Sequence, residues 1–141
     1  MPPLTLVQAR SLIDAALAAA RVNGFKPMGV VVVDAAAQVV ASAREDGASA
    51  LRLDIALGKA ASAIGMGVNS RALAARAKDL PAFFGAIAAT AQQKFIPQTG
   101  AVLITDAGGA VIGAAGASGG TGDEDEQIVI AGIAAIGLGH A

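Results

Sequence analysis

The stretch Gly100-Ala-Val-Leu-Ile-Thr-Asp-Ala-Gly-Gly-Ala-Val-Ile-Gly-Ala-Ala-Gly-Ala-Ser118 decides the fold class of this 141-residue chain. Two apolar runs flank Asp106 and a pair of glycines, a pattern that predicts two strands joined by a tight turn. An earlier stretch, VVVVDAAAQVV at 30–40, has the same order of apolar run, Asp-Ala and apolar run. This internal similarity indicates either a helix–hairpin unit that is used twice or two independent turns that each begin at an aspartate.

Helical patterns precede, separate and follow the two hairpins. Thr5 and Gln8 form a capping box, apolar residues then recur at helical spacing, and Gly24 is placed to end a helix over 5–23. Further helices are predicted over 51–65, over a short segment with Ser70 as its N-cap, from Asp79 and Pro81, and over 123–138. The sequence therefore predicts a single α+β domain over residues 1–141, in the order α-ββ-α-α-α-ββ-α, with a mainly antiparallel central sheet flanked by helices.

The composition is unusually apolar for a single domain. Hydrophobic residues make up 55% of the chain and charged residues only 15%, and Val30–Val33 is apolar on both faces of its predicted strand. Helices can cover one face of the sheet, and helices or another subunit must cover the other. A surface this poor in charge favours a homo-oligomer.

Several classes of function are disfavoured by what the chain lacks. A net charge of −1 without a basic cluster, and the absence of Trp and Tyr, argue against nucleic-acid binding. With no cysteine and one histidine, we expect no Cys- or His-based metal site. The first residues lack a basic segment and no apolar run reaches the length of a membrane span, so we expect a cytoplasmic protein without a membrane partner.

Three segments carry a resemblance to a known family. They are VVVVDAAAQVVASARED at 30–46, LDIALGKAASA at 53–63 and the closing motif G-A-x-G-x-S-G-x-x-G-x-x-D-E at 113–126. Together with the capped first helix, they make the chain similar to the GlcG/HbpS-like proteins, which include the C-terminal domain of PduO-type proteins. The resemblance implies a profilin-like or PAS-like antiparallel sheet, homo-oligomers from dimer to octamer, and heme or another tetrapyrrole as the ligand of some members.

Two departures from the family pattern bear on the ligand. The second hairpin of the family usually opens with Gly-Gly-x-Pro, whereas this chain has Thr-Gly-Ala-Val-Leu at 99–103, so the entry to the strand is expected to differ. Heme-binding relatives can use a histidine of the first helix, and the first predicted helix here has none. An oxygen ligand from Thr or Asp, with propionate contacts from Arg44 or Lys59, is the remaining route to heme.

The segment Ser118-Gly-Gly-Thr-Gly-Asp-Glu-Asp-Glu126 places glycines directly before four acids. Backbone N–H groups before a helix attract anions, but four carboxylates in its first turn compensate the helix dipole and repel a phosphate. One interpretation is a structural turn that is capped by its own acids. The other is that Ser118 and Gly119 line a ligand pocket, with Asp125 or Glu126 as an acid–base or hydrogen-bonding group.

Charged residues elsewhere give further candidates. Asp54 and Lys59 lie in one predicted helix, about 140° apart around its axis. Asp54 shares its face with small residues, so we expect it to be buried and paired, whereas Lys59 lies on a more polar face and is either solvated or part of a site. Arg44 either binds a ligand carboxylate or lies on a solvated hairpin edge. His140 is interpreted as part of a frayed tail rather than as a ligand.

Three functions remain open on these grounds. The first is a homo-oligomeric domain that binds a small molecule such as heme, with Arg44, Asp54, Lys59, Ser118 and Gly119 as ligand-binding candidates. The second is a cofactor-independent acid–base enzyme of small carboxylate or aromatic-compound catabolism. Asp125, Glu126 and Lys59 are its catalytic candidates. The third is an accessory protein that stabilises a partner enzyme and has no ligand of its own.

Overall fold

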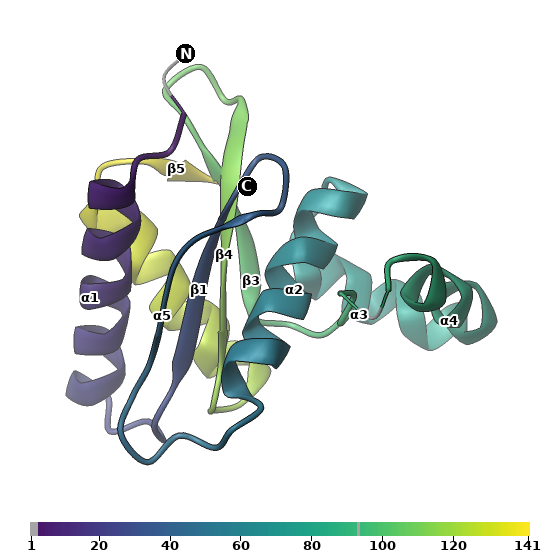
Figure 1. The fold of residues 1–141 in the computed structure, drawn as a ribbon, viewed down its shortest axis with the longest axis horizontal. Helices are drawn as coiled ribbons and strands as arrows, with labels where there is room; N and C mark the ends of the chain where they lie inside the picture. Colours follow the sequence, from purple (N-terminus) through teal and green to yellow (C-terminus); the bar gives the residue numbers. More distant parts are fainter. Residues whose placement is uncertain (1–2, 93) are drawn as a thin grey trace.

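The computed structural model describes residues 3–92 and 94–141, which form five helices and one five-stranded sheet (Figure 1). In chain order the elements are α1 (Leu6–Val22), β1 (Gly29–Asp34), β2 (Val39–Arg44), α2 (Arg52–Met66), α3 (Ser70–Asp79), α4 (Pro81–Thr90), β3 (Ala101–Thr105), β4 (Val111–Ser118), α5 (Gly122–Ala135) and β5 (Gly139–His140). The strands lie in the order β2-β1-β4-β3-β5, and every neighbouring pair is antiparallel. The predicted α+β class and the predicted order of elements up to α5 are confirmed.

The first helix begins and ends as its sequence predicts. The Thr5 side chain accepts a hydrogen bond from the backbone N–H of Gln8, and the Gln8 side chain accepts one from the backbone N–H of Thr5. Such a reciprocal pair satisfies two of the N–H groups that a helix start leaves without partners. At the other end Gly24 takes a φ of +68°, a conformation that glycine adopts without steric cost.

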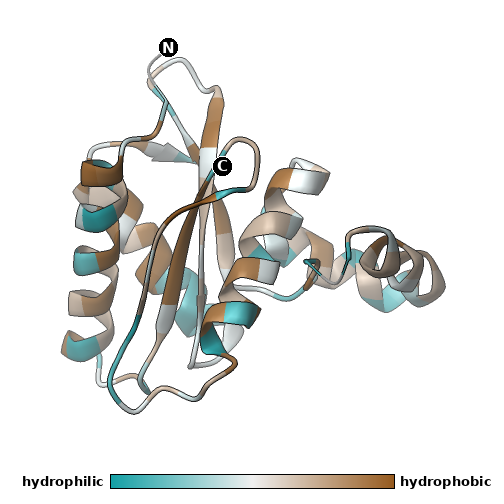
Figure 2. Ribbon diagram, viewed as in Figure 1, coloured by the Kyte–Doolittle hydropathy of each residue, from teal (hydrophilic) through white to brown (hydrophobic). Residues whose placement is uncertain are grey.

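The sheet is covered by helices on both faces, which resolves the alternative left open for Val30–Val33. Val30 and Val32 belong to a core shared with α1 and α5, whereas Val31 and Val33 pack with α2. Figure 1 shows the sheet edge-on between these two helical layers, and Figure 2 shows strong hydrophobicity along β1 at its centre. Because each fully buried Val contributes roughly 1.5–3 kcal/mol, a strand that is apolar on both faces fixes the three-layer arrangement.

Two local predictions were wrong. The N-cap of α3 is Asn69 rather than Ser70, and the Ser70 hydroxyl instead accepts a hydrogen bond from the backbone N–H of Ala101 at 2.8 Å. Ser70 therefore ties α3 to the start of β3. The chain end is not frayed, because Gly139 and His140 form β5 and pair with Thr105 and Ile104 of β3.

Helices α3 and α4 lie outside the three layers. Figure 1 shows α4 extending away from the sheet beyond α2 and α3. These helices have a small core of their own, in which Leu73, Phe84 and Phe95 are buried together and the rings of Phe84 and Phe95 stack at 5.9 Å. In the part of the chain that the structure describes, no helix is both long enough and apolar enough to cross a bilayer.

Candidate functional site

A polar hollow of about 450 Å³ lies where the first turns of α2 meet the end of β4 and the start of α5. Its wall is formed by Arg52, Ile55, Lys59, Gln98, Thr99, Ser118, Gly120, Thr121, Gly122, Asp123 and Asp125. Three of the residues singled out from the sequence, Lys59, Ser118 and Asp125, meet here although they are far apart in the chain. The hollow is therefore the candidate functional site.

The floor of the polar hollow is a buried ion pair between Lys59 and Asp125. Lys59 Nζ lies 3.0 Å from Asp125 Oδ2, and the two residues are only 5% and 2% exposed. Lys59 also donates to the backbone carbonyl of Ala117 at 3.0 Å, and Asp125 Oδ1 accepts from the backbone N–H of Gly120 at 2.9 Å. These contacts join α2, β4 and α5 at one point, and of the two alternatives left open for Lys59 they exclude a solvated side chain.

Burial and pairing act in opposite directions on Asp125. Removal from water raises the pKa of its carboxyl above the ordinary 3.8, because burial penalises the charged form. The charge and hydrogen bond of Lys59, and the N–H of Gly120, lower the pKa and oppose this shift. A carboxyl whose pKa lies above its usual value is suited to hold a proton or a hydrogen bond, but catalysis by Asp125, Glu126 or Lys59 stays a prediction.

Arg52 and Ser118 form the wall next to this pair. Arg52 Nη1 donates to the hydroxyl oxygen of Ser118 at 3.1 Å, and Ser118 is 2% exposed. Arg52 is not among the candidates found from the sequence. Its spacing from Ile55 and Lys59 places all three on one face of α2, and this signal could have found it.

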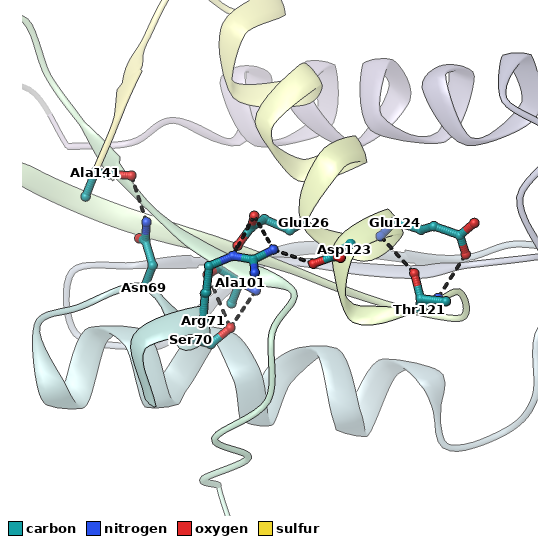
Figure 3. A network of polar contacts seen from close by, with 9 residues as sticks. All are labelled: Asn69, Ser70, Arg71, Ala101, Thr121, Asp123, Glu124, Glu126 and Ala141. Carbon is teal, nitrogen blue, oxygen red and sulfur yellow. Dashed lines mark hydrogen bonds and ion pairs between the residues drawn. The ribbon is translucent and has the colours of Figure 1, made fainter. Parts of the chain in front are cut away.

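The four acids at the start of α5 have three different sets of partners. Glu124 completes a capping box with Thr121, whose side chain accepts from the Glu124 N–H at 3.2 Å. Asp123 and Glu126 both bind the guanidinium of Arg71 from α3, with Glu126 contacting two of its nitrogens at 3.0–3.2 Å (Figure 3). Asp125 is buried and faces Lys59 instead. Of the four acids, Glu124 alone caps the turn as the structural interpretation expected, and Asp125 alone forms part of the floor of the hollow.

The remaining candidates lie outside the polar hollow. The sequence predicted that Asp54 is buried, but it is exposed. Its position on α2 is rotated away from that of Lys59. Arg44 donates to the carbonyl of Ala48 at 2.7 Å and lines a different hollow. Gly119 is buried with φ +151°, and a Cβ placed there would lie 2.3 Å from the carbonyl oxygen of Pro27. Gly119 therefore lies where the backbone of the turn packs directly against the backbone at Pro27.

A second, apolar hollow of about 370 Å³ lies between α2, α4 and the segment after α4. It is lined by Ala61, Gly65, Met66, Phe83, Ala86, Ile87, Thr90, Ala91, Lys94 and Phe95. The sequence alone does not locate it, because its lining comes from separate segments, α2, α4 and the residues after α4. Two phenylalanines, one isoleucine and one methionine give it the character of a pocket for an apolar ligand.

Comparison with known proteins gives one family match. The sequence matches the family described as "Haem degrading protein HbpS-like" over residues 4–134. No curated protein matches the chain.

Three solved structures share the fold over nearly the whole chain. A PduOC:heme complex is 27% identical with a TM-score of 0.87, and the match covers 98% of each chain. A variant of HbpS from Streptomyces reticuli is 30% identical with a TM-score of 0.81, covering 95% of this chain and 87% of that one. The ORFY protein of Klebsiella pneumoniae, of the DUF336 family, is 26% identical with a TM-score of 0.86, covering 97% and 92%.

Proposed function

The chain belongs to the HbpS-like family, and on this premise we propose that it is a small-molecule-binding domain whose ligand is heme. The observation that carries the proposal is the heme complex of a structure that has the same fold along 98% of both chains. The family description, which names heme as the molecule acted on, supports the same ligand.

Of the two hollows, the apolar one has the lining that suits a porphyrin. The polar hollow has two carboxylates and two cations in its wall and only one large aliphatic side chain, Ile55, which is a poor surface for a flat apolar ring. The apolar hollow offers Phe83 and Phe95 for contact with such a ring and the ammonium of Lys94 for a propionate. We therefore assign heme to the hollow between α2 and α4.

The side chain that would reach the iron is Met66. Heme iron takes axial ligands such as histidine, cysteine or methionine, and Met66 supplies a thioether within the lining of the apolar hollow. The one histidine of the chain, His140, lies on β5 and lines neither hollow. This chain would then hold heme without the first-helix histidine that the family resemblance led us to look for.

We expect Phe83→Ser to weaken heme binding by about 10-fold or more, since burying a large aromatic side chain stabilises a complex by roughly 1.5–3 kcal/mol. Phe83 is 56% exposed, so its replacement leaves the core intact. The measurement is a titration with hemin that is followed by the Soret band. Val39→Ser is the matched control, because Val39 is exposed on β2 and lines neither hollow.

A second variant tests whether Met66 would bind the iron. Met66→Leu conserves side-chain volume, so we expect hemin to bind but with a shifted Soret band. Hemin that binds wild type and Phe83→Ser with equal affinity, or does not bind wild type, would contradict the assignment. Sedimentation velocity of each variant checks that it has the same oligomeric state as wild type, so that the hemin affinities can be compared directly.

We further propose that the chain forms a homo-oligomer. Large apolar side chains are exposed on α1, at Leu6, Val7 and Val22, and at Leu80 where α3 meets α4. Burying such side chains in a contact between copies removes apolar area from water. Sedimentation velocity at micromolar concentration is expected to show a species between dimer and octamer, and a monomer would contradict this proposal.

A further inference from the structure

We infer that the polar hollow is a binding site for a small carboxylate anion, with Arg52 as its principal contact. This inference does not depend on heme binding, because the two hollows share no lining residue. It also differs from the sequence-based expectation, in which Arg44 or Lys59 was to hold a carboxylate.

The first support is the balance of charge in the wall. Two cations, Arg52 and Lys59, line the hollow together with two acids, Asp123 and Asp125. Asp123 has a side chain that is 81% exposed and is bound to Arg71, so its charge lies in water and is already paired. The interior of the hollow therefore holds two positive groups against the single buried carboxylate of Asp125, and this net positive charge favours an anionic ligand.

The second support is the number of hydrogen-bond donors that remain free. A guanidinium has five N–H donors, and Arg52 has one acceptor, Ser118 Oγ, among residues 3–92 and 94–141. A lysine ammonium has three donors, and within the same described residues Lys59 has two acceptors, Ala117 and Asp125. The guanidinium of Arg52 therefore keeps a free edge with which it can bind a carboxylate bidentately. The ammonium of Lys59 keeps one free N–H, although Lys59 is only 5% exposed.

The lining also indicates the class of carboxylate. Beside Arg52 lie the hydroxyls of Ser118 and Thr99 and the amide of Gln98, all of which bind hydroxyl or carbonyl groups. Ile55 is the one large aliphatic residue of the wall, so little surface is available for an aromatic ring. A small hydroxy acid or dicarboxylate fits this arrangement, and a volume of about 450 Å³ leaves room for it.

The test is calorimetric titration of the full chain with L-malate, which carries both carboxylates and a hydroxyl. We expect wild type to bind malate and Arg52→Gln to bind it at least 10-fold more weakly, because a charge-assisted bidentate contact is lost. Arg52→Lys is expected to lie between the two, since it keeps the charge but not the paired donors. Arg44→Gln is the matched control, because it removes an arginine from another hollow, and it should bind like wild type.

Two further probes define the ligand class. Inorganic phosphate is expected to bind more weakly than malate, and the uncharged diamide of malate is expected not to bind. The inference is overturned if malate does not bind, if Arg52→Gln binds it as tightly as wild type, or if phosphate binds more tightly than malate. A thermal unfolding curve shows whether Arg52→Gln is folded, and if it is not, the Arg52→Lys result decides.

Discussion

Replacing Lys59 with Met is expected to lower the free energy of unfolding by about 3–5 kcal/mol, the range observed when one partner of a buried ion pair is removed. Methionine is about as long as lysine and is apolar, so it fills the same space without supplying a charge. Asp125 would then lie buried with only the N–H of Gly120 as a hydrogen-bond partner, and the carbonyl of Ala117 would lose its donor. Urea unfolding at neutral pH measures the change.

Removing the acid instead of the base is expected to cost less. In Asp125→Asn the Lys59 ammonium loses its ion pair but keeps two acceptors, the amide oxygen and the carbonyl of Ala117, while the N–H of Gly120 loses its acceptor. The double variant Lys59→Met/Asp125→Asn is therefore expected to be more stable than Lys59→Met alone, since no unpaired charge remains in the interior. If Lys59→Met unfolds with a free energy within about 1 kcal/mol of wild type, the pair is not the buried link between α2 and α5 described above.

Gly119→Ala is expected to destabilise the fold by roughly 2–5 kcal/mol, from overpacking and backbone strain together. Gly119 has a φ of +151°, which residues with a side chain rarely adopt, and an added Cβ would meet the carbonyl oxygen of Pro27 at 2.3 Å. The chain before β1 and the turn after β4 would have to separate. Because this turn leads into α5 and Asp125, the polar hollow would be displaced as well.

Gly85→Ala is the matched control for this prediction. Gly85 lies in α4, is exposed, and has no atom within 4 Å of an added Cβ. Alanine in a helix is favoured over glycine, so this variant is expected to be as stable as wild type or about 0.5–1 kcal/mol more stable. Thermal or urea unfolding of both variants makes the comparison. Equal stability of Gly119→Ala and wild type would show that the turn can relax without cost.

The sequence predicted those parts of the fold that local signals specify. The capping box of Thr5, the apolar run of Val30–Val33 and the paired Asp-Ala turns each determine an element from residues that are close together in the chain. Strand β5 was missed because Gly139 and His140 have no strand pattern of their own. They pair only because the end of α5 brings them to the free edge of β3.

The candidate site was predicted in part, for a similar reason. Ser118 and Asp125 were found because the motif between them is unusual, but the burial of Lys59 was not, since a lysine in a helix is usually solvated. The exposure of Asp54 was misjudged because small residues on its helical face were assumed to pack closely. The hollow between α2 and α4 depends on contacts between separate segments, which no local pattern specifies, whereas Arg52 could have been found from its place on the face of α2 that carries Lys59.

The most direct test of heme as the ligand is native mass spectrometry of the protein purified from its own host, followed by release of any bound molecule under denaturing conditions. It reports the ligand and the state of association in one experiment. We predict an oligomer that retains a tetrapyrrole, either as purified or after incubation with hemin. A protein that remains empty after incubation with hemin would contradict the proposal that this chain is a heme-binding domain.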